Sequence, residues 1–327
     1  MQEGCSGCQG VCRFLAHGYR GRMADVVAEV AGRTLKLTNL EKVLYPSGFT
    51  KGEVIDYYRT VAPVLLPHLA RRPVTRVRFP HGTTGASFFE KNVPAGAPPW
   101  LQRQIVDGSE GEVVYPLVDG VPALVYLANL AALELHSTQW RTPDPDAAVR
   151  LSPEVLVDQV VVDLDPGAGV TMPLIATAAL LVAGELGAAG LAAFAKTSGS
   201  KGIQVYAPVQ PTPAGDALGY VQGLAEALVS RHPELFVTAI GRDARVGRLL
   251  LDVNQNLPGR TTVSVYSLRA RDTPTVSAPV TWEEVEAAAD GAQLSFTAPE
   301  VLARVESRGD LFSGLLAQRR GVLPARP

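Results

Sequence analysis

The segment Asp158–Pro166 reads DQVVVDLDP and is the part of the sequence that decides the fold. An apolar run of this length that ends at a turn signal predicts a strand buried inside a sheet. Because side chains alternate along a strand, Asp163 and Asp165 lie on one face and Leu164 lies on the other. Two carboxylates held so close together require a cation between them. The alternative is an ordinary exit from strand to loop, where aspartate is common before proline and glycine.

The segments that follow this strand predict helices and strands in alternation. The Ala-rich stretch 170–195 contains Pro173, Glu185 and glycines, which favours a helix packed on a sheet and then a strand over a transmembrane span. The remaining predicted elements are a hairpin with a Gly-rich turn (192–209), a helix (214–230), two strands (246–252 and 261–271) and a helix that begins at Thr281 with a capping box to Glu284.

The segments before the strand predict a similar mixture. Apolar residues at helical spacing follow Thr50, so a helix begins at Lys51. Residues 71–82 predict a short strand bounded by Pro73 and Pro80, and VVYPL and ALVYLAN within 113–129 are also strand-like. Because no repeat or linker divides the chain, we expect one α/β domain of the α+β type over residues 23–327, with central mixed and antiparallel sheets flanked by helices.

The composition is that of a globular protein with little net charge. The 327 residues are 46% hydrophobic and 19% charged, which provides enough apolar material for a core and argues against disorder. Lys and Arg number 30 against 32 Asp and Glu, so the formal net charge is −2. This balance excludes a histone-like polycation, but it leaves room for a local basic groove that binds nucleic acid.

All three cysteines, Cys5, Cys8 and Cys12, lie close to the N-terminus. Their spacing resembles iron–sulfur ligation but lacks a fourth ligand. We therefore expect residues 1–22 to be a disordered extension, or the product of a start codon misassigned upstream of Met23. The long cysteine-free body and the lack of a secretory signal fit a cytoplasmic protein with no membrane attachment.

A third carboxylate completes a candidate metal site. Asp252 ends another apolar run, VGRLLLD, and can reach the same point if the two strands are neighbours. Three carboxylates without histidine or cysteine suit Mg²⁺ or Mn²⁺ bound by oxygen. Such a set fits the two-metal centre of phosphoryl transfer, although a metal-dependent nuclease would share it.

The Gly-rich turn Thr197–Gly202 is a candidate phosphate site, because it offers small residues, backbone N–H groups and Lys201. It is no P-loop, since that pattern fails at the Gly-Lys step, and a solvated hairpin turn is the alternative. Arg269 could clamp a triphosphate with two hydrogen bonds, or it could be an exposed strand arginine. His136 follows an apolar run, where a lone histidine is more often structural.

Basic and aromatic side chains are interleaved in the first third of the chain. They are Lys36, Lys42, Lys51, Arg76, Arg78, Phe88, Phe89 and Lys91. Positive charge beside aromatic faces is typical of surfaces that bind single strands or DNA ends. Core packing is the alternative for Phe88 and Phe89. Because neighbouring residues on a strand point opposite ways, we expect one of the two to be free to stack.

Several motifs occur in an order that closely resembles the polymerase domain of bacterial ligase D, a member of the archaeo-eukaryotic primase superfamily. They are LTNLEKVLYP (37–46), RPVTRVRFPHG (72–82), ANLAALELH (128–136), DLDP (163–166), KTSGSKG (196–202), Asp252 with NQN (254–256), and YSLRAR (266–271). The resemblance runs from about Leu35 to about Trp282. It implies a primase-like catalytic core that adds nucleotides at DNA breaks in bacterial non-homologous end joining, often with a preference for ribonucleotides and Mn²⁺. A protein with this activity would be nucleoid-associated.

The resemblance also implies roles for individual residues. The metal ligands and catalytic residues would be Asp163, Asp165 and Asp252, at a two-metal site for Mn²⁺ or Mg²⁺. The residues that bind the incoming NTP or dNTP would be Ser198, Lys201, Gln255, Arg269 and His136. The DNA contacts would be Lys42 and Lys51, on a 5′-phosphate of the downstream strand at an end or gap, and Phe88 and Phe89, stacked on the template end.

One position departs from the family pattern. The family turn reads S-G-x-K-G-x-H, whereas the last position here is Gln204, an amide that donates a hydrogen bond but never carries positive charge. This predicts a weaker grip on the nucleotide. It also leaves a second hypothesis, a non-catalytic or weakly active DNA-end-binding protein with a degraded nucleotide pocket. The retained carboxylates argue against that hypothesis, because idle clustered carboxylates repel one another.

The sequence contains neither a ligase lysine motif nor a histidine-rich phosphoesterase segment. We therefore expect a stand-alone polymerase. The Ku end-binding protein and a separate ATP-dependent DNA ligase are partners that the resemblance implies.

Overall fold

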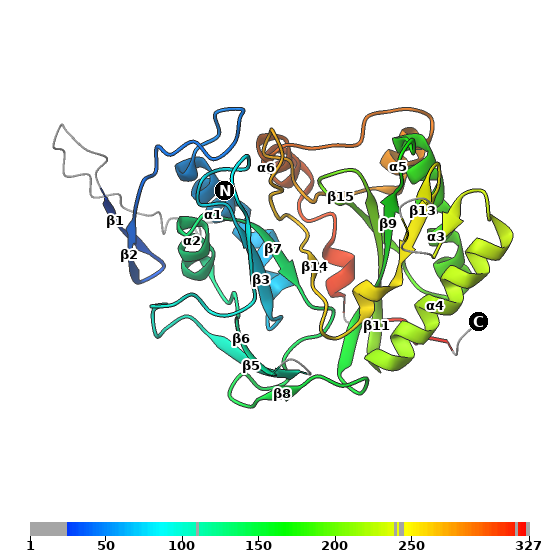
Figure 1. Ribbon diagram of the computed structural model, residues 1–327, viewed down its shortest axis with the longest axis horizontal. Coiled ribbons are helices and arrows are strands. Elements are labelled where there is room, and N and C mark those ends of the chain that lie inside the picture. The colour runs from blue at the N-terminus through cyan, green and yellow to red at the C-terminus, as the bar shows by residue number, and fades with distance from the viewer. Residues whose placement is uncertain (1–24, 109–110, 239–240, 242–244, 318–319, 325–327) are drawn as a thin grey trace, which may run out of the picture.

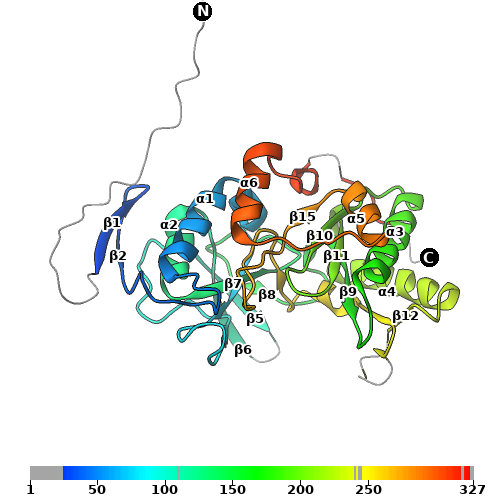
Figure 2. The ribbon, with the colours of Figure 1, turned by 90° about the horizontal axis from the view of Figure 1, so that it is seen from above.

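The computed structural model describes residues 25–108, 111–238, 241, 245–317 and 320–324. These residues form two lobes that lie side by side, each with its own cluster of buried hydrophobic side chains (Figures 1 and 2). Separate sheets flanked by helices confirm the predicted fold class. The extent of the single domain stays a prediction. The predicted N-terminal extension and its three cysteines lie outside the described residues.

The helices are α1 (Lys51–Leu69), α2 (Val121–Asn129), α3 (Met172–Ala188), α4 (Ala214–Arg231), α5 (Trp282–Ala289) and α6 (Ala298–Arg308), with 3-10 helices η2 (Val253–Asn256) and η3 (Ser313–Leu316). The strands are β1 (Val26–Val30), β2 (Arg33–Leu37), β3 (Val74–Arg78), β4 (Phe88–Glu90), β5 (Arg103–Gly108), β6 (Gly111–Pro116), β7 (Ala132–Ser137), β8 (Val149–Arg150), β9 (Leu156–Pro166), β10 (Phe194–Thr197), β11 (Ile203–Pro213), β12 (Phe236–Val237), β13 (Leu249–Asp252), β14 (Thr262–Val263) and β15 (Pro279–Val280).

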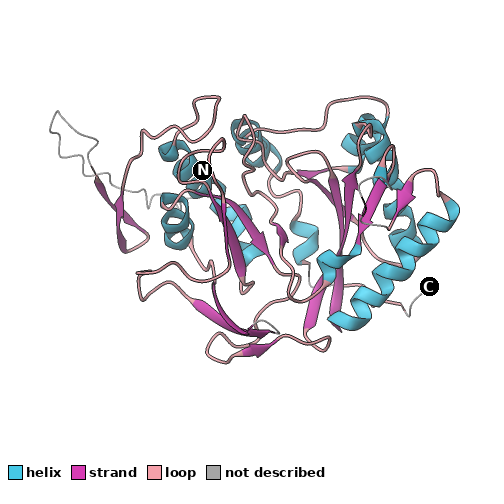
Figure 3. Cartoon of the chain, viewed as in Figure 1, coloured by secondary structure: helices cyan, strands magenta, loops and turns pink. Residues whose placement is uncertain are grey.

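The second lobe is built on a six-stranded sheet in the order β12-β13-β9-β11-β10-β15. Helices α3 and α4 cover its outer side (Figure 3). Along β9, Val160, Val162 and Leu164 belong to the core beneath these helices, whereas Val161 belongs to the cluster of the first lobe. Because side chains alternate along a strand, Asp163 shares the face of Val161. The inner face of this sheet therefore carries the carboxylates toward the first lobe.

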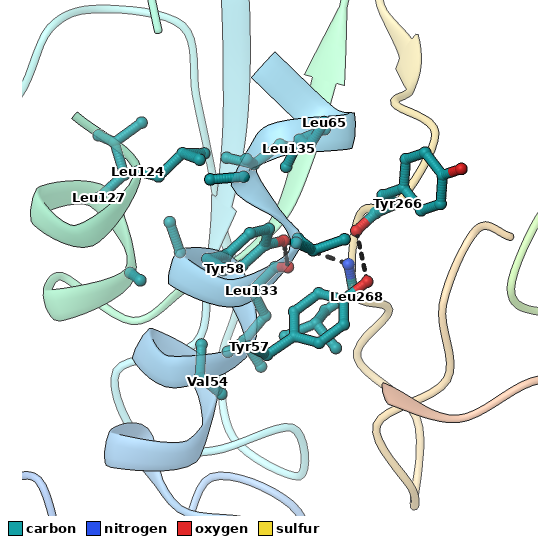
Figure 4. Close-up of a cluster of buried hydrophobic side chains, with 14 of the residues drawn as sticks. Val54, Tyr57, Tyr58, Leu65, Leu124, Leu127, Leu133, Leu135, Tyr266 and Leu268 are labelled. Atoms are coloured by element: carbon teal, nitrogen blue, oxygen red, sulfur yellow. Dashed lines mark hydrogen bonds between the residues drawn. The ribbon is translucent and has the colours of Figure 1, made fainter. Parts of the chain in front are cut away.

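The first lobe packs α1 and α2 against a four-stranded sheet in the order β14-β7-β3-β4. Its core contains tyrosines whose hydroxyl groups bond to distant backbone (Figure 4). Tyr57 donates to the Tyr266 carbonyl at 2.8 Å, and Tyr58 donates to the Leu133 carbonyl at 2.6 Å. These bonds satisfy polar groups in an apolar core, which would otherwise cost free energy. They also fix the segment that carries Arg269 against α1.

Two smaller sheets complete the fold. A three-stranded sheet, β6-β5-β8, lies below the first lobe in Figure 1. The β1-β2 hairpin projects from the side of the first lobe that faces away from the second lobe.

Within the described residues, no helix has the length and apolar character needed to cross a bilayer.

Two predicted helix starts are confirmed. Thr50 and Glu53 form a capping box at the start of α1, and Thr281 and Glu284 form another at the start of α5. A capping box satisfies N–H groups that a helix start leaves without partners, so the local sequence alone can fix the boundary.

Two predicted strands are wrong. Residues 123–129 form most of helix α2, because a continuous apolar run suits a buried helix as well as a buried strand, and Pro122 sits in its first turn. Of the predicted strand 261–271, only β14 forms. Tyr266 then takes a left-handed conformation with φ 63°, which ends the extended geometry.

Candidate functional site

A cavity of about 1330 Å³ lies where the inner face of the six-stranded sheet meets the first lobe and the three-stranded sheet. It brings together residues from sequence positions far apart. The predicted site residues that line it are Phe89, His136, Asp163, Asp165, Ser198, Lys201, Gln204, Asp252, Gln255 and Arg269. The residues that do not line it are Phe88, Lys42 and Lys51.

The two carboxylates predicted to come from neighbouring strands are paired across them. Strands β9 and β13 are antiparallel neighbours, and Asp163 is in direct register with Asp252. Burial raises the pKa of Asp163 to about 6, and the negative charges of Asp252 and Asp165 add to the rise. A cation at this place would relieve both effects.

The carboxylates do not form a finished three-ligand site. Asp165 Oδ2 lies 2.6 Å from Arg245 Nη1, and Asp252 accepts from the Asn254 N–H at 3.1 Å and from Gln255 Nε2 at 2.8 Å. No three carboxylate, imidazole or thiolate groups among the described residues are placed to hold one ion together. All three aspartates line the cavity, but oxygens of Asp165 and Asp252 are bonded to protein donors in this arrangement, so joint metal binding by the three stays a prediction. The oxygen donor set itself still fits Mg²⁺ or Mn²⁺.

The side chains paired across the sheet beside Asp163 include a buried lysine, Lys196, to which the sequence alone assigns no role. Register pairs Asp163 with Gln204 on β11, and Gln204 with Lys196 on β10. Lys196 is 1% exposed, and its Nζ donates to the Val263 carbonyl at 3.0 Å, to Ser277 Oγ at 2.7 Å and to Gln204 Oε1.

Lys196 fixes the orientation of the Gln204 amide. A lysine ammonium only donates, so Oε1 of Gln204 faces Lys196 and its Nε2 faces Asp163, with which it hydrogen-bonds. Burial lowers the pKa of Lys196 to about 7. Gln204 thus enters the cavity as a fixed, neutral donor.

The Gly-rich turn is packed rather than solvated. Ser198 Oγ accepts from the Gly202 N–H at 3.0 Å and from the Ser200 N–H at 3.3 Å. Gly199 has φ +67°, and a Cβ there would lie 2.6 Å from Arg269 Cγ. Two of the N–H groups expected to hold phosphate are therefore already bonded to Ser198. The exposed Lys201 side chain remains at the cavity wall.

Arg269 and His136 share one carboxylate partner, Glu134. This residue lies within the motif ANLAALELH, but the sequence alone predicts no role for it. His136 Nε2 lies 3.0 Å from Glu134 Oε2, and Arg269 Nε lies 3.1 Å from Glu134 Oε1. Burial would raise the pKa of Glu134, but the hydrogen bond to His136 and the charge of Arg269 overcome it and lower the pKa to about 2. Arg269 Nη1 also donates to the Ser198 carbonyl at 2.6 Å. Arg269 is therefore neither an exposed nor a strand arginine.

The lysines assigned to the 5′-phosphate lie together, away from the cavity. Lys51 is 5% exposed, and its Nζ donates to the Thr38 carbonyl at 2.5 Å. Burial and the nearby charge of Lys42 lower the pKa of Lys51 to about 8.

The aromatic pair differs from expectation. Phe88 is 47% exposed and Phe89 is 58% exposed, so the expectation that one of them is buried is wrong. They lie on β4, a three-residue strand at the edge of its sheet. Arg76 also differs from the predicted basic surface, because it is 2% exposed and pairs with Glu90.

Comparison with known proteins gives this site a context. A family model described as "LigD, primase-polymerase domain" matches residues 50–312. The chain belongs to this family. The LigD primase-polymerase match spans both lobes and every cavity residue named above.

Individual LigD proteins support the family match. The "Multifunctional non-homologous end joining DNA repair protein LigD" of Mycobacterium tuberculosis is 41% identical over 281 residues, which cover 85% of this chain and 36% of that protein. The "Bifunctional non-homologous end joining protein LigD" of Bacillus subtilis is 34% identical over 85% of this chain and 43% of that protein. The chain thus spans well under half the length of these LigD proteins.

A solved structure matches the fold of this LigD primase-polymerase domain. The "Polymerase Domain from Mycobacterium tuberculosis Ligase D in complex with DNA" superposes with a TM-score of 0.81 at 39% sequence identity. The match covers 87% of this chain and 98% of that one. The fold described here is therefore that of a ligase D polymerase domain.

Proposed function

We propose that this LigD primase-polymerase domain is a template-directed, metal-dependent nucleotidyltransferase. It would add ribo- or deoxynucleotides at DNA ends or gaps during bacterial non-homologous end joining. The observation that carries the proposal is the cross-strand pair of Asp163 and Asp252 on the cavity wall, within one cavity that Lys201 and Arg269 also line. A carboxylate pair beside cationic side chains matches the charge distribution of metal-assisted phosphoryl transfer.

The nucleotide triphosphate would bind in the cavity, against the wall to which the Gly-rich turn and Arg269 both contribute. Lys201 supplies an exposed positive charge, and Arg269 supplies a guanidinium already anchored to the turn through Ser198. Gln204 supplies an oriented N–H donor, and His136 and Gln255 line the same wall. Holding the α-phosphate in line with a primer 3′-hydroxyl converts an encounter of two molecules into a reaction within one complex.

Asp163, Asp165 and Asp252 would hold the divalent cations, Mn²⁺ or Mg²⁺. Such ions, when bound, activate the attacking hydroxyl and stabilise charge on the phosphate. For these residues to bind an ion together, Asp165 must leave Arg245, and Asp252 must leave Gln255. The protein's own task at this place is to hold carboxylates on one sheet face in fixed register.

DNA would lie across the first lobe. The related Mycobacterium tuberculosis polymerase domain was solved in complex with DNA, which supports a DNA substrate for this chain. Lys42 and Lys51 would contact the 5′-phosphate of the downstream strand, and the exposed rings of Phe88 and Phe89 would stack on the template end. Ku and a separate ATP-dependent DNA ligase would be its partners in end joining.

Extension of a gapped duplex tests this function. The substrate carries a labelled primer and either a 5′-phosphate or a 5′-hydroxyl on the downstream strand, and each nucleotide type is supplied with Mn²⁺ or Mg²⁺. We expect templated incorporation that requires the metal and is stronger with the 5′-phosphate. Specific DNA binding without incorporation under any of these conditions would instead favour a non-catalytic end-binding protein, which Gln204 and the paired Asp165 leave as the second candidate.

A further inference from the structure

Glu134 on β7 is a buried carboxylate outside the cavity that contacts two side chains inside it. Its side chain is 10% exposed, and it does not line the cavity, whereas His136 and Arg269 both do. Each carboxylate oxygen is used. Oε2 faces His136 Nε2, and Oε1 accepts from the Ala270 N–H at 3.1 Å while facing Arg269 Nε.

We propose that Glu134 is a positioning residue that sets His136 and Arg269 in the geometry needed to bind the nucleotide triphosphate. The proposal rests on the proposed function, since it assigns a support to the same pocket. Glu134 would act only through these two side chains.

The contacts form a chain that reaches the Gly-rich turn. Arg269 is held on one edge by Glu134, and its Nη1 donates to the Ser198 carbonyl at 2.6 Å. The aliphatic part of Arg269 also fills the space beside Gly199, where a Cβ would lie 2.6 Å from its Cγ. A shift of Arg269 therefore disturbs the turn that carries Lys201. Placement errors of about 1 Å at such sites reduce rates strongly.

The same carboxylate joins segments that the chain alone does not hold together. Glu134 and His136 belong to β7, whereas Arg269 and Ala270 belong to the irregular segment after β14. Glu134 also places a negative charge between an imidazole and a guanidinium, so the two can stay close together in a half-buried site. No other carboxylate contact to His136 or Arg269 is found among the described residues.

Glu134→Gln tests the proposal without changing the volume of the side chain. An amide keeps one oxygen for Arg269 and the Ala270 N–H, but it replaces the oxygen facing His136 Nε2 with an N–H donor and removes the negative charge beside Arg269. We expect the nucleotide KM to rise roughly ten- to a hundredfold, with kcat falling less than about threefold. Mn²⁺ affinity should stay within about twofold of wild type, since the aspartates are untouched. Glu134→Asp, which keeps the charge but shortens the chain, should recover part of the loss.

Glu284→Gln is the matched control. Glu284 also pairs with two arginines, Arg304 and Arg308, but lies on α5 and does not line the cavity. We expect its thermal stability to fall about as far as that of Glu134→Gln, with the nucleotide KM unchanged. If both variants raised KM equally, general loosening of the fold would explain the effect and the proposal would be overturned.

A double-variant cycle separates positioning from a merely structural role. Once Arg269→Ala has removed the positioned group, adding Glu134→Gln should raise KM by no more than about threefold, which is the share due to His136. The proposal would be overturned if the double variant raised the nucleotide KM by the product of the factors of the two single variants. It would also be overturned if the KM of Glu134→Gln lay within about twofold of wild type. Titration with a fluorescent ribonucleotide analogue, with no DNA present, gives the same comparison if extension fails. A failed extension assay thus counts against the proposed function, whereas an unchanged nucleotide affinity counts against Glu134.

Discussion

Asp158→Asn is expected to destabilise the protein in a way that depends on pH. Asp158 lies at the start of β9, the strand that carries Asp163, and it accepts from Arg72 Nη2 at 2.6 Å and Arg141 Nε at 2.9 Å. Arg320 Nη1 lies 3.0 Å from the same carboxylate. These ion pairs tie β9 to the first lobe and to the C-terminal segment.

The magnitude follows from the pKa. Burial works to raise the pKa of Asp158, but the charges of Arg72 and Arg141 overcome it and lower the pKa from 3.8 to about 2. At about 1.4 kcal/mol per pKa unit, the carboxylate contributes roughly 2.5 kcal/mol to the free energy of unfolding. Because the folded pKa is the lower one, this contribution is complete above pH 3.8 and is lost as the pH falls toward 2.

Urea unfolding of wild type and Asp158→Asn at a series of pH values measures this contribution. We expect a difference of at least about 2.5 kcal/mol at pH 7, because the variant also leaves buried Arg72 without its charged partner, and a smaller difference near pH 2. Asp56→Asn is the control, since Asp56 forms an exposed pair with Arg59, which should contribute less than about 1 kcal/mol. A loss for Asp158→Asn as small as the control's, or one that does not change with pH, would refute the reasoning.

Three further predictions concern the site. Both Gly199 and Gly190 have positive φ, but only at Gly199 would a Cβ meet Arg269. Gly199→Ala should therefore lower the free energy of unfolding by roughly 2 kcal/mol more than Gly190→Ala, as measured by thermal unfolding. Of the two variants, only Gly199→Ala should raise the nucleotide KM. Equal effects of the two substitutions would contradict it. Gln204→His should lower the nucleotide KM, because an imidazole can carry charge, and an unaltered KM would count against a weakened grip. In DNA-binding titrations, the preference for a 5′-phosphate over a 5′-hydroxyl should weaken above pH 8, because Lys51 loses its proton there. The preference should persist above pH 8 in Lys51→Arg, since a guanidinium stays charged. Equal pH profiles for wild type and Lys51→Arg would argue against a contact between Lys51 and the 5′-phosphate.

The sequence was most informative where local rules decide the structure. The alternation in DQVVVDLDP placed Asp163 and Leu164 on opposite faces of β9, as the two core clusters confirm. The capping box at Thr281 predicts the start of α5, which the structure confirms. Both features depend on residues within a few positions of one another, so no knowledge of the tertiary structure was needed.

Features that depend on register or burial were less accessible. The role of Lys196 arises from its pairing with Gln204 on β11, and that of Glu134 from contacts with Arg269, which lies 135 positions later. The prediction of a strand over residues 123–129 is wrong because a continuous apolar run carries no period that separates a strand from a helix. The exposure of both Phe88 and Phe89 depends on β4 being an edge strand.

The aspartates on the inner sheet face are the residues that we propose make this domain a metal-dependent polymerase. The most direct measurement compares Mn²⁺-dependent incorporation on a gapped, 5′-phosphorylated duplex by wild type, Asp252→Ala and the control Asp216→Ala, an exposed aspartate on α4. We predict that Asp252→Ala lowers incorporation by roughly a thousandfold or more while binding the duplex like wild type, and that Asp216→Ala matches wild type in both. Incorporation by Asp252→Ala above about a tenth of the wild-type rate would contradict the account.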